Sequence, residues 1–202
     1  MEANNKLDFN VCINEARAFH GDACAGIIIG TRMAILGLNK IGIKDPKGTD
    51  RKNIIVFVEM DRCASDAILA VTGCHPGKRT MKIFDHGKMA ATFVNLKTGK
   101  AVRVWEKNRD GNKVTTREEI EKSPHTEEYA MMPVEDLFEA REVRVELKPE
   151  DLPGKPLCIV TCEACGERIL DMRHERKNGK ILCRPCAAGN NYYSCLEETE
   201  SE

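Results

Sequence analysis

The chain begins with two stretches whose apolar residues recur at a helical period. Between residues 9 and 19 they lie at the spacing of one helix face, which predicts a first helix. Asp22 is a suitable N-cap for a second helix over residues 23–41. This second stretch is apolar nearly all round and contains three glycines, so we expect it to lie buried against close neighbours.

Strand patterns follow these helices. A nearly continuous β-branched run over residues 53–60 predicts a buried strand, and residues 63–74 predict a helix. A meander of antiparallel strands, separated by the turn sequences DHGK and KTGK, is then predicted over residues 81–85, 89–96 and 101–106. A short helix over 133–140 and a strand over 141–147 complete the series. This order predicts an α+β fold, with N-terminal helices packed on a mainly antiparallel sheet.

Proline and cysteine divide the chain into parts. The proline-rich segment 149–156 predicts a linker after a core domain that occupies residues 1–148. Residues 157–195 are rich in cysteine and predict a small separate module, and residues 196–202 form an acidic tail. The sequence therefore predicts an α+β core domain followed by a cysteine-rich appendage.

Composition and charge restrict the partners and the compartment. The 202 residues carry a net charge of −1, which gives no electrostatic signature of nucleic-acid or membrane binding. The most apolar stretch, residues 23–38, is too short to span a bilayer, and the first residues, MEANNKLDF, lack the pattern of a signal peptide. We therefore expect a cytoplasmic protein. Because disulfides rarely persist in that compartment, its ten cysteines indicate metal sites rather than cross-links.

The cysteine-rich module has the spacing of a zinc site. The pairs CEAC and CRPC give the pattern C-x2-C-x17-C-x2-C. Two such turns can close a tetrahedron of thiolates around one Zn²⁺, with the ligands Cys162, Cys165, Cys183 and Cys186. Iron, in a rubredoxin-like site or a cluster, accepts the same thiolates and is the alternative. A four-thiolate site has no open position, so we expect a zinc finger that stabilises the protein or binds a partner.

Soft and ionisable side chains also gather at element boundaries in the core domain. His20 and Cys24 lie four residues apart in FHGDACAG, where a helix N-terminus would favour the thiolate. Asp61 and Cys63 follow the predicted strand, and Cys74 lies in the loop after the next helix. Taken one at a time, each of these residues can equally be explained as a packed or a surface residue without a chemical role. Together they predict a shared metal or thiol site, with Cys24, His20 and Asp61 as the catalytic candidates.

Three segments carry a resemblance to a known family. FHGDACAGIIIGTRMAILGL, VEMDRCASDAILAVTGC and FDHGKMAATFVNLKTGKAVRV, in this order, resemble the family of the E subunit of formylmethanofuran dehydrogenase. The segment CEACGERI…CRPC resembles the auxiliary zinc finger of treble-clef type that some members append. The resemblance implies an α+β core that dimerises. It also implies an association with the molybdenum- or tungsten-dependent enzyme that reduces CO₂ onto methanofuran in methanogens.

The family motifs fall on individual residues of this chain. His20 and Cys24 match its HGxxCxG motif, Cys63 matches the cysteine of DxCxxDA, and Cys74 matches the TGC position. Ala25 departs from the family, in which many members have proline here. With the resemblance, we expect a second divalent metal, zinc by preference, held by His20, Cys24 and Cys63, with Cys74 or a nearby carboxylate completing or supporting the shell.

The leading hypothesis is an accessory metal-binding protein, a homodimer that associates with a molybdenum or tungsten oxidoreductase. The chain has neither a molybdopterin signature nor a ferredoxin-like cysteine run, so we do not expect it to be a redox catalyst on its own. A small metal- or thiol-dependent enzyme that uses the His20, Cys24 and Cys63 cleft is the alternative. A zinc-finger regulator that binds nucleic acid is a weaker alternative, because the net charge opposes it.

Overall fold

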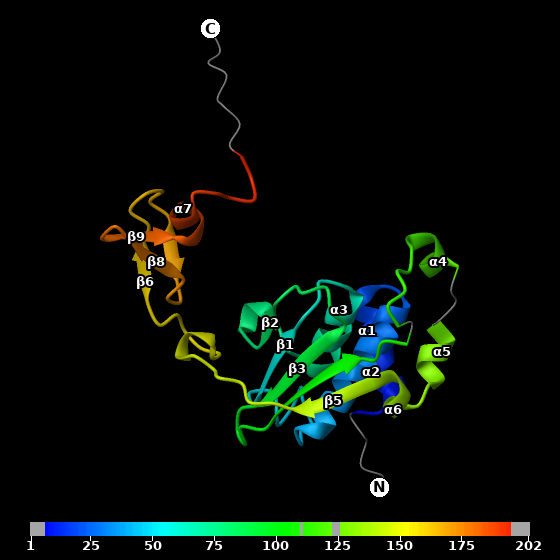
Figure 1. Ribbon diagram of the computed structural model, residues 1–202. Helices are drawn as coiled ribbons and strands as arrows, with labels where there is room; N and C mark the ends of the chain where they lie inside the picture. Colours follow the sequence, from blue (N-terminus) through cyan, green and yellow to red (C-terminus); the bar gives the residue numbers. More distant parts are fainter. Residues whose placement is uncertain (1–6, 110, 123–125, 195–202) are drawn as a thin grey trace. The chain divides into compact units, whose positions relative to one another are not determined.

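The computed structural model describes residues 7–109, 111–122 and 126–194 (Figure 1). The chain divides into two compact units, Met1–Leu147 and Lys148–Glu202. We refer to them as the core domain and the finger, and each is described by itself. No helix of the described residues is long and apolar enough to cross a membrane.

The first two predicted helices are present. Helix α1 (Phe9–His20) begins at Asp8, whose carboxylate accepts hydrogen bonds from two backbone N–H groups of the first turn, and ends at a left-handed Gly21. Helix α2 (Ala25–Lys40) differs from the prediction at its start, because Cys24 and not Asp22 is the N-cap. The Cys24 carbonyl already accepts the first helical hydrogen bonds, so the helix begins directly after this cysteine.

The core domain also contains a five-stranded mixed sheet, with the strands in the order β2-β1-β3-β4-β5. The strands are β1 (Ile54–Val58), β2 (Met81–Ile83), β3 (Ala90–Asn95), β4 (Ala101–Glu106) and β5 (Phe138–Glu142). The prediction of an antiparallel meander is wrong at its first member, since β2 pairs with β1 in parallel. Helix α3 (Cys63–Thr72) connects β1 to β2, and a crossover of this kind is what a parallel pair requires. The remaining pairs are antiparallel, so the α+β prediction is confirmed.

The segment between β4 and β5 contains three short helices, α4 (Arg117–Glu121), α5 (Thr126–Met131) and α6 (Val134–Leu137). The helix predicted over 133–140 is shorter than expected, because Phe138 already pairs with Glu106 as the first residue of β5. The strand predicted over 141–147 accordingly starts earlier and ends at Glu142. A single 3₁₀ turn, η1 (Pro76–Lys78), precedes β2.

The main apolar core lies between the helices and one face of the sheet. More than half of the residues of helix α2 are buried, and the helix packs against α3, β3 and β4. Gly37 is needed at the crossing with β3, because a Cβ there would lie 2.2 Å from the ring of the fully buried Phe93. The apolar pattern that predicted a buried second helix is therefore explained by packing within one chain.

The opposite face of the sheet carries an ion pair that links β4 to the end of β1. Arg103 donates two hydrogen bonds to the carboxylate of Glu59, from Nε to Oε1 at 2.6 Å and from Nη2 to Oε2 at 2.8 Å. Its guanidinium also lies over the ring of Trp105, 5.0 Å from the centroid. The hydrogen bonds from Arg103 lower the pKa of Glu59 below its ordinary value.

Glu59→Gln is expected to destabilise the core domain by about 1–3 kcal/mol at pH 7, because two charge-assisted hydrogen bonds are weakened. Since the folded-state pKa of Glu59 is lowered, this contribution is present above the unfolded-state pKa of about 4.3 and is lost as pH falls through the folded-state pKa. Urea unfolding at pH 7 and in acid measures the difference. Glu142→Gln removes an exposed pair with Lys100 and should change stability by less than about 1 kcal/mol. Equal losses in the two variants would contradict the prediction.

The finger consists of two hairpins and a short helix. Strand β6 (Ile159–Thr161) pairs with β7 (Arg168–Leu170), and β8 (His174–Lys177) pairs with β9 (Lys180–Cys183). Helix α7 (Arg184–Ala188) follows β9, and a 3₁₀ turn, η2 (Pro149–Asp151), precedes the hairpins. Its buried apolar cluster is small and consists of Cys162, Ile169, Leu182 and Ala187.

Candidate metal centres

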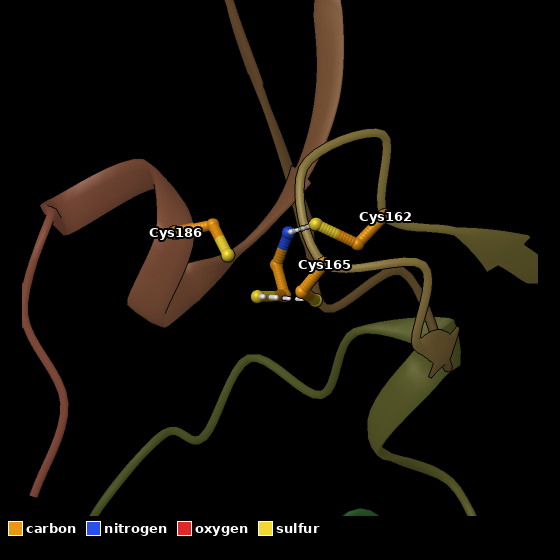
Figure 2. Close-up of side chains that lie close together, drawn as sticks. Cys162, Cys165 and Cys186 are labelled. Atoms are coloured by element: carbon orange, nitrogen blue, oxygen red, sulfur yellow. Dashed lines mark hydrogen bonds between the residues drawn. The ribbon is translucent and has the colours of Figure 1, made fainter. Parts of the chain in front are cut away.

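The finger brings its four predicted ligands together. Cys162 and Cys165 lie in the turn between β6 and β7, Cys183 ends β9, and Cys186 lies in α7. Their Sγ atoms all lie within 4.8 Å of one another. Figure 2 shows the side chains of Cys162, Cys165 and Cys186 pointing into the same space. Four sulfurs converge there from two separate knuckles, which is the arrangement of a structural zinc site.

Backbone hydrogen bonds favour the ionised form of Cys162, whereas the hydrogen bond with Cys183 raises the pKa of Cys186. The N–H of Cys183 donates to Sγ of Cys162 at 3.3 Å. Hydrogen bonds from the backbone of Cys165 and Cys183 lower the pKa of Cys162 to about 6. Gly166 takes a left-handed φ of 77° directly after the first cysteine pair, where a side chain would be strained. Because thiolates are the form that binds metal, the donor set fits a Zn²⁺ ion held by four cysteines.

A second cluster lies where three helix ends of the core domain meet. His20 is the last residue of α1, Cys24 is the N-cap of α2, and Cys63 is the first residue of α3. One ligand atom from each lies within 4.8 Å of the other two, and all three residues are partly exposed. Three of the side chains singled out from the sequence are thus brought together, although His20 and Cys63 lie 43 positions apart.

Close packing between α2 and α3 creates this cluster. At Gly26 an added Cβ would lie 3.1 Å from Cβ of Cys63 and 3.6 Å from Sγ of Cys24. At Gly30, one turn further along α2, it would lie 2.6 Å from the carbonyl oxygen of Ala64. Two glycines at this spacing allow the backbone of α3 to approach α2 directly. The GIIIG sequence therefore positions the two cysteines.

Asp66 orients the histidine. Nδ1 of His20 lies 2.8 Å from Oδ2 of Asp66, which is one turn after Cys63 on α3. In a neutral imidazole, an Nδ1–H that donates to this carboxylate leaves the lone pair on Nε2. A carboxylate behind a histidine in this way is typical of metal-binding imidazoles. Nothing in the local sequence around Asp66 indicates this contact with α1.

The two thiols influence each other. Burial and the hydrogen bond with Cys24 raise the pKa of Cys63 above its ordinary value. Two neighbouring thiolates repel each other, which disfavours ionisation of both thiols at once. A bound cation would remove this penalty, and the positive N-terminal ends of α2 and α3 act in the same direction. One imidazole and two thiolates form a donor set that fits a zinc ion with one position open.

Other residues named from the sequence lie elsewhere. Cys74 is only 2% exposed and its Sγ lies 3.9 Å from the carbonyl oxygen of Ile54. Burial raises the pKa of Cys74 to about 11, as it does for the buried Cys12. The structure therefore does not bring Cys74 to the other three residues. Asp61 is exposed in the connection between β1 and α3 and is not part of the cluster. The last residue of the predicted cysteine-rich module, Cys195, and the acidic tail 196–202 lie outside the described residues.

The core domain and the finger each match a known protein family. Residues 19–153 match the family described as "FmdE, Molybdenum formylmethanofuran dehydrogenase operon". Residues 159–192 match the "Prokaryotic dksA/traR C4-type zinc finger".

A curated relative from Archaeoglobus fulgidus, named "Probable S-adenosyl-L-methionine-binding protein", is 28% identical over 214 residues. That match covers 96% of this chain but only 57% of the relative. A crystal structure of a tungsten formylmethanofuran dehydrogenase FmdE-like protein from Syntrophus aciditrophicus is 27% identical. The structural match covers 96% of this chain and 100% of the chain in that crystal structure, with a TM-score of 0.59. The chain therefore belongs to the FmdE family, and a C4-type zinc finger follows its core domain.

Proposed function

We propose that this protein is an accessory metal-binding protein whose core domain holds a divalent metal, zinc by preference, in addition to the zinc of the finger. The observation that carries the proposal is the meeting of His20, Cys24 and Cys63 within 4.8 Å. Support comes from Asp66, which leaves Nε2 of His20 available for a metal. These three residues would bind the ion, and the partly exposed setting leaves its remaining position accessible.

The partner we propose is a molybdenum or tungsten formylmethanofuran dehydrogenase, or a similar oxidoreductase. The matched family and the protein of the matched crystal structure are both named after that enzyme. In this role the protein would supply or stabilise a metal centre rather than carry out the redox reaction. We further propose that it acts in the cytoplasm as a homodimer. The family resemblance supports the dimer; the apolar residues of α2 add no support, because most of them are buried within their own chain.

A small metal-dependent enzyme is the second candidate. The observation that favours it is the number of ligands: three protein side chains converge in the core cluster, whereas four converge in the finger. Structural zinc sites are closed by four protein ligands, while catalytic sites keep one position for water or substrate. When bound there, a metal of this kind supplies Lewis-acid chemistry. The chain's own contribution would be to hold the ion and to orient His20 through Asp66.

Metal analysis of the full chain tests the proposal. We expect two metal ions per chain in the wild type, one in Cys24→Ala and one in Cys162→Ala, because the two clusters share no residue. Purification from a host that expresses a molybdenum or tungsten oxidoreductase should recover that enzyme with the protein. One ion per chain, retained in Cys24→Ala, would contradict the core site. Two ions without any such partner would favour the small enzyme.

Asp66→Asn is expected to weaken metal binding at the core site by about 10–100-fold, because an amide no longer fixes the proton on Nδ1 of His20. Competition with a chromophoric chelator measures the affinity, while the finger keeps its zinc and serves as an internal reference. Asp61→Asn changes the same kind of side chain at an exposed position outside the cluster and should bind as the wild type does. Equal affinities in both variants would show that Asp66 does not position the ligand.

A further inference from the structure

We propose that Cys24 and Cys63 close a reversible disulfide bond, and that this bond and the core metal exclude each other. The oxidation state of the pair would then determine whether the core site can hold a metal. The disulfide itself depends only on the two thiols. Its consequence for metal binding rests on the proposed function.

The position of the two thiols carries this inference. Both cysteines are free, and their Sγ atoms lie within 4.8 Å of each other. Gly26 lies beside both cysteines. A Cβ atom at this position would lie 3.1 Å from Cβ of Cys63 and 3.6 Å from Sγ of Cys24. No side chain of Gly26 therefore fills the space next to the sulfurs. The bond we propose requires that rotation of these side chains bring the two sulfurs from this separation to bonding distance.

Accessibility distinguishes this pair from the other cysteines of the core domain. Cys24 and Cys63 are partly exposed, whereas Cys12 and Cys74 are 1% and 2% exposed. Thiol–disulfide exchange requires a thiolate that a reagent can reach. Of the four described cysteines in the core domain, the two that lie together are also the two that a small molecule can reach. Cys12 then serves as a natural control in the same domain.

The oxidant we assign is a small-molecule disulfide, RSSR. The thiolate of one cysteine attacks a sulfur of RSSR, which forms a protein–SR bond, breaks the S–S bond and releases one RS⁻. The thiolate of the other cysteine then attacks the protein sulfur, forms the bond between Cys24 and Cys63, and releases the second RS⁻. The two protons lost by the protein thiols end on the two RSH products. One RSSR is reduced and one protein dithiol is oxidised, and excess thiol reverses both steps.

A cysteine sulfur cannot bind the metal as a thiolate and form a disulfide at the same time. A thiolate binds metal through a lone pair and a negative charge, and a sulfur in a disulfide no longer carries that charge. After oxidation His20 alone would face the metal, and one imidazole does not hold zinc. Conversely, a bound metal occupies both sulfurs and slows their oxidation. Zinc at about 100 times its Kd leaves about 1% of the site free, so oxidation should slow by about 100-fold.

The experiment uses the full chain with the Cys74→Ser substitution, because Cys63 and Cys74 fall in the same tryptic peptide, residues 63–78. The reduced protein is treated with oxidised glutathione, alkylated, digested and analysed by mass spectrometry. We expect peptide 18–32, which contains Cys24, to be linked to peptide 63–78 and to be released by dithiothreitol. Cys12 should not be oxidised, so its thiol should be alkylated once the treated protein is unfolded. The linked peptide should be absent from a variant that also carries Cys63→Ser.

Metal content of the same samples completes the test. The oxidised chain should lose the core metal and regain it after reduction, and added zinc should delay the linkage. Stable glutathione adducts on Cys24 or Cys63 without the internal link would overturn the inference, while the metal proposal could still hold. A linked chain that binds core metal as tightly as the reduced chain would overturn the mutual exclusion. A reduced chain that binds finger zinc alone would contradict the proposed function, and linkage in that sample would still support the disulfide.

Discussion

Replacing Cys183 by serine is expected to release the zinc of the finger and to unfold that unit, while the core domain stays folded. The apolar cluster of the finger contains four residues, two of them cysteine and alanine, which is too few to stabilise a module of this size without metal. In small zinc modules the apparent free energy of metal binding is about 10–16 kcal/mol at neutral pH and is also the free energy of folding. Loss of one thiolate opens the tetrahedron and removes most of this energy.

Two-dimensional amide NMR of the full chain measures the outcome, because resonances of the two units can be followed separately. Signals from residues 159–188 should collapse to the narrow range of an unfolded chain, while those of the core domain stay dispersed. Cys158→Ser is the matched control, since this cysteine belongs to the finger but lies outside the four-sulfur cluster. It should retain zinc and dispersion. A folded finger in Cys183→Ser would show that its small core suffices.

The finger was predictable from the sequence because its chemistry is local. Cysteines two residues apart must lie in one turn, and the two pairs could only be satisfied by each other. The C-terminal ends of two helices also have a local signal in the sequence. Gly21 and Gly73 directly follow α1 and α3 and take the left-handed conformation that ends a helix. Such signals depend on a few neighbouring residues and survive whatever the rest of the chain does.

Strand pairing and side-chain direction were harder to predict from the sequence, because they depend on distant parts of the chain. Nothing within residues 81–85 indicates that β2 pairs with β1 rather than with β3. Cys63 and Cys74 both lie at ends of α3, and the sequence could not tell which would face the site. Packing decides it: the N-terminal end of α3 meets Cys24, while Cys74 turns toward β1. The contact of Asp66 with His20 likewise joins residues 46 positions apart.

The two clusters differ in what they contribute to the protein. In the finger, backbone N–H groups surround a sulfur and four cysteines close the coordination, so the metal takes the place of a core. In the core domain, a large apolar core already holds α2 and α3 in place, and the three ligands project from helix ends at its edge. Removing the metal from the core site should therefore leave the domain folded. A site that is not needed for folding is free to exchange its metal or its oxidation state.

Gly30→Ala is expected to destabilise the core domain and to weaken metal binding at its site. The new Cβ would lie 2.6 Å from the carbonyl oxygen of Ala64, 2.7 Å from its Cα and 2.9 Å from Cβ of Ala67. Two of these are backbone atoms of α3, which cannot turn aside as a long side chain can. The helices must separate, at a cost of about 1–3 kcal/mol or more. For a domain of this size each kcal/mol lowers Tm by about 2–4 °C.

Separation of α2 from α3 acts on the site as well as on stability, because Cys24 and Cys63 belong one to each helix. Thermal unfolding and the affinity of the core site for zinc should therefore fall together. Gly77→Ala provides the control: this glycine is exposed, has no strained φ, and an added Cβ meets nothing within 4 Å. Its effect should stay within about 0.5 kcal/mol. If Gly30→Ala lowered Tm while zinc affinity remained unchanged, the cysteines would be positioned by their own loops and not by the contact between the helices.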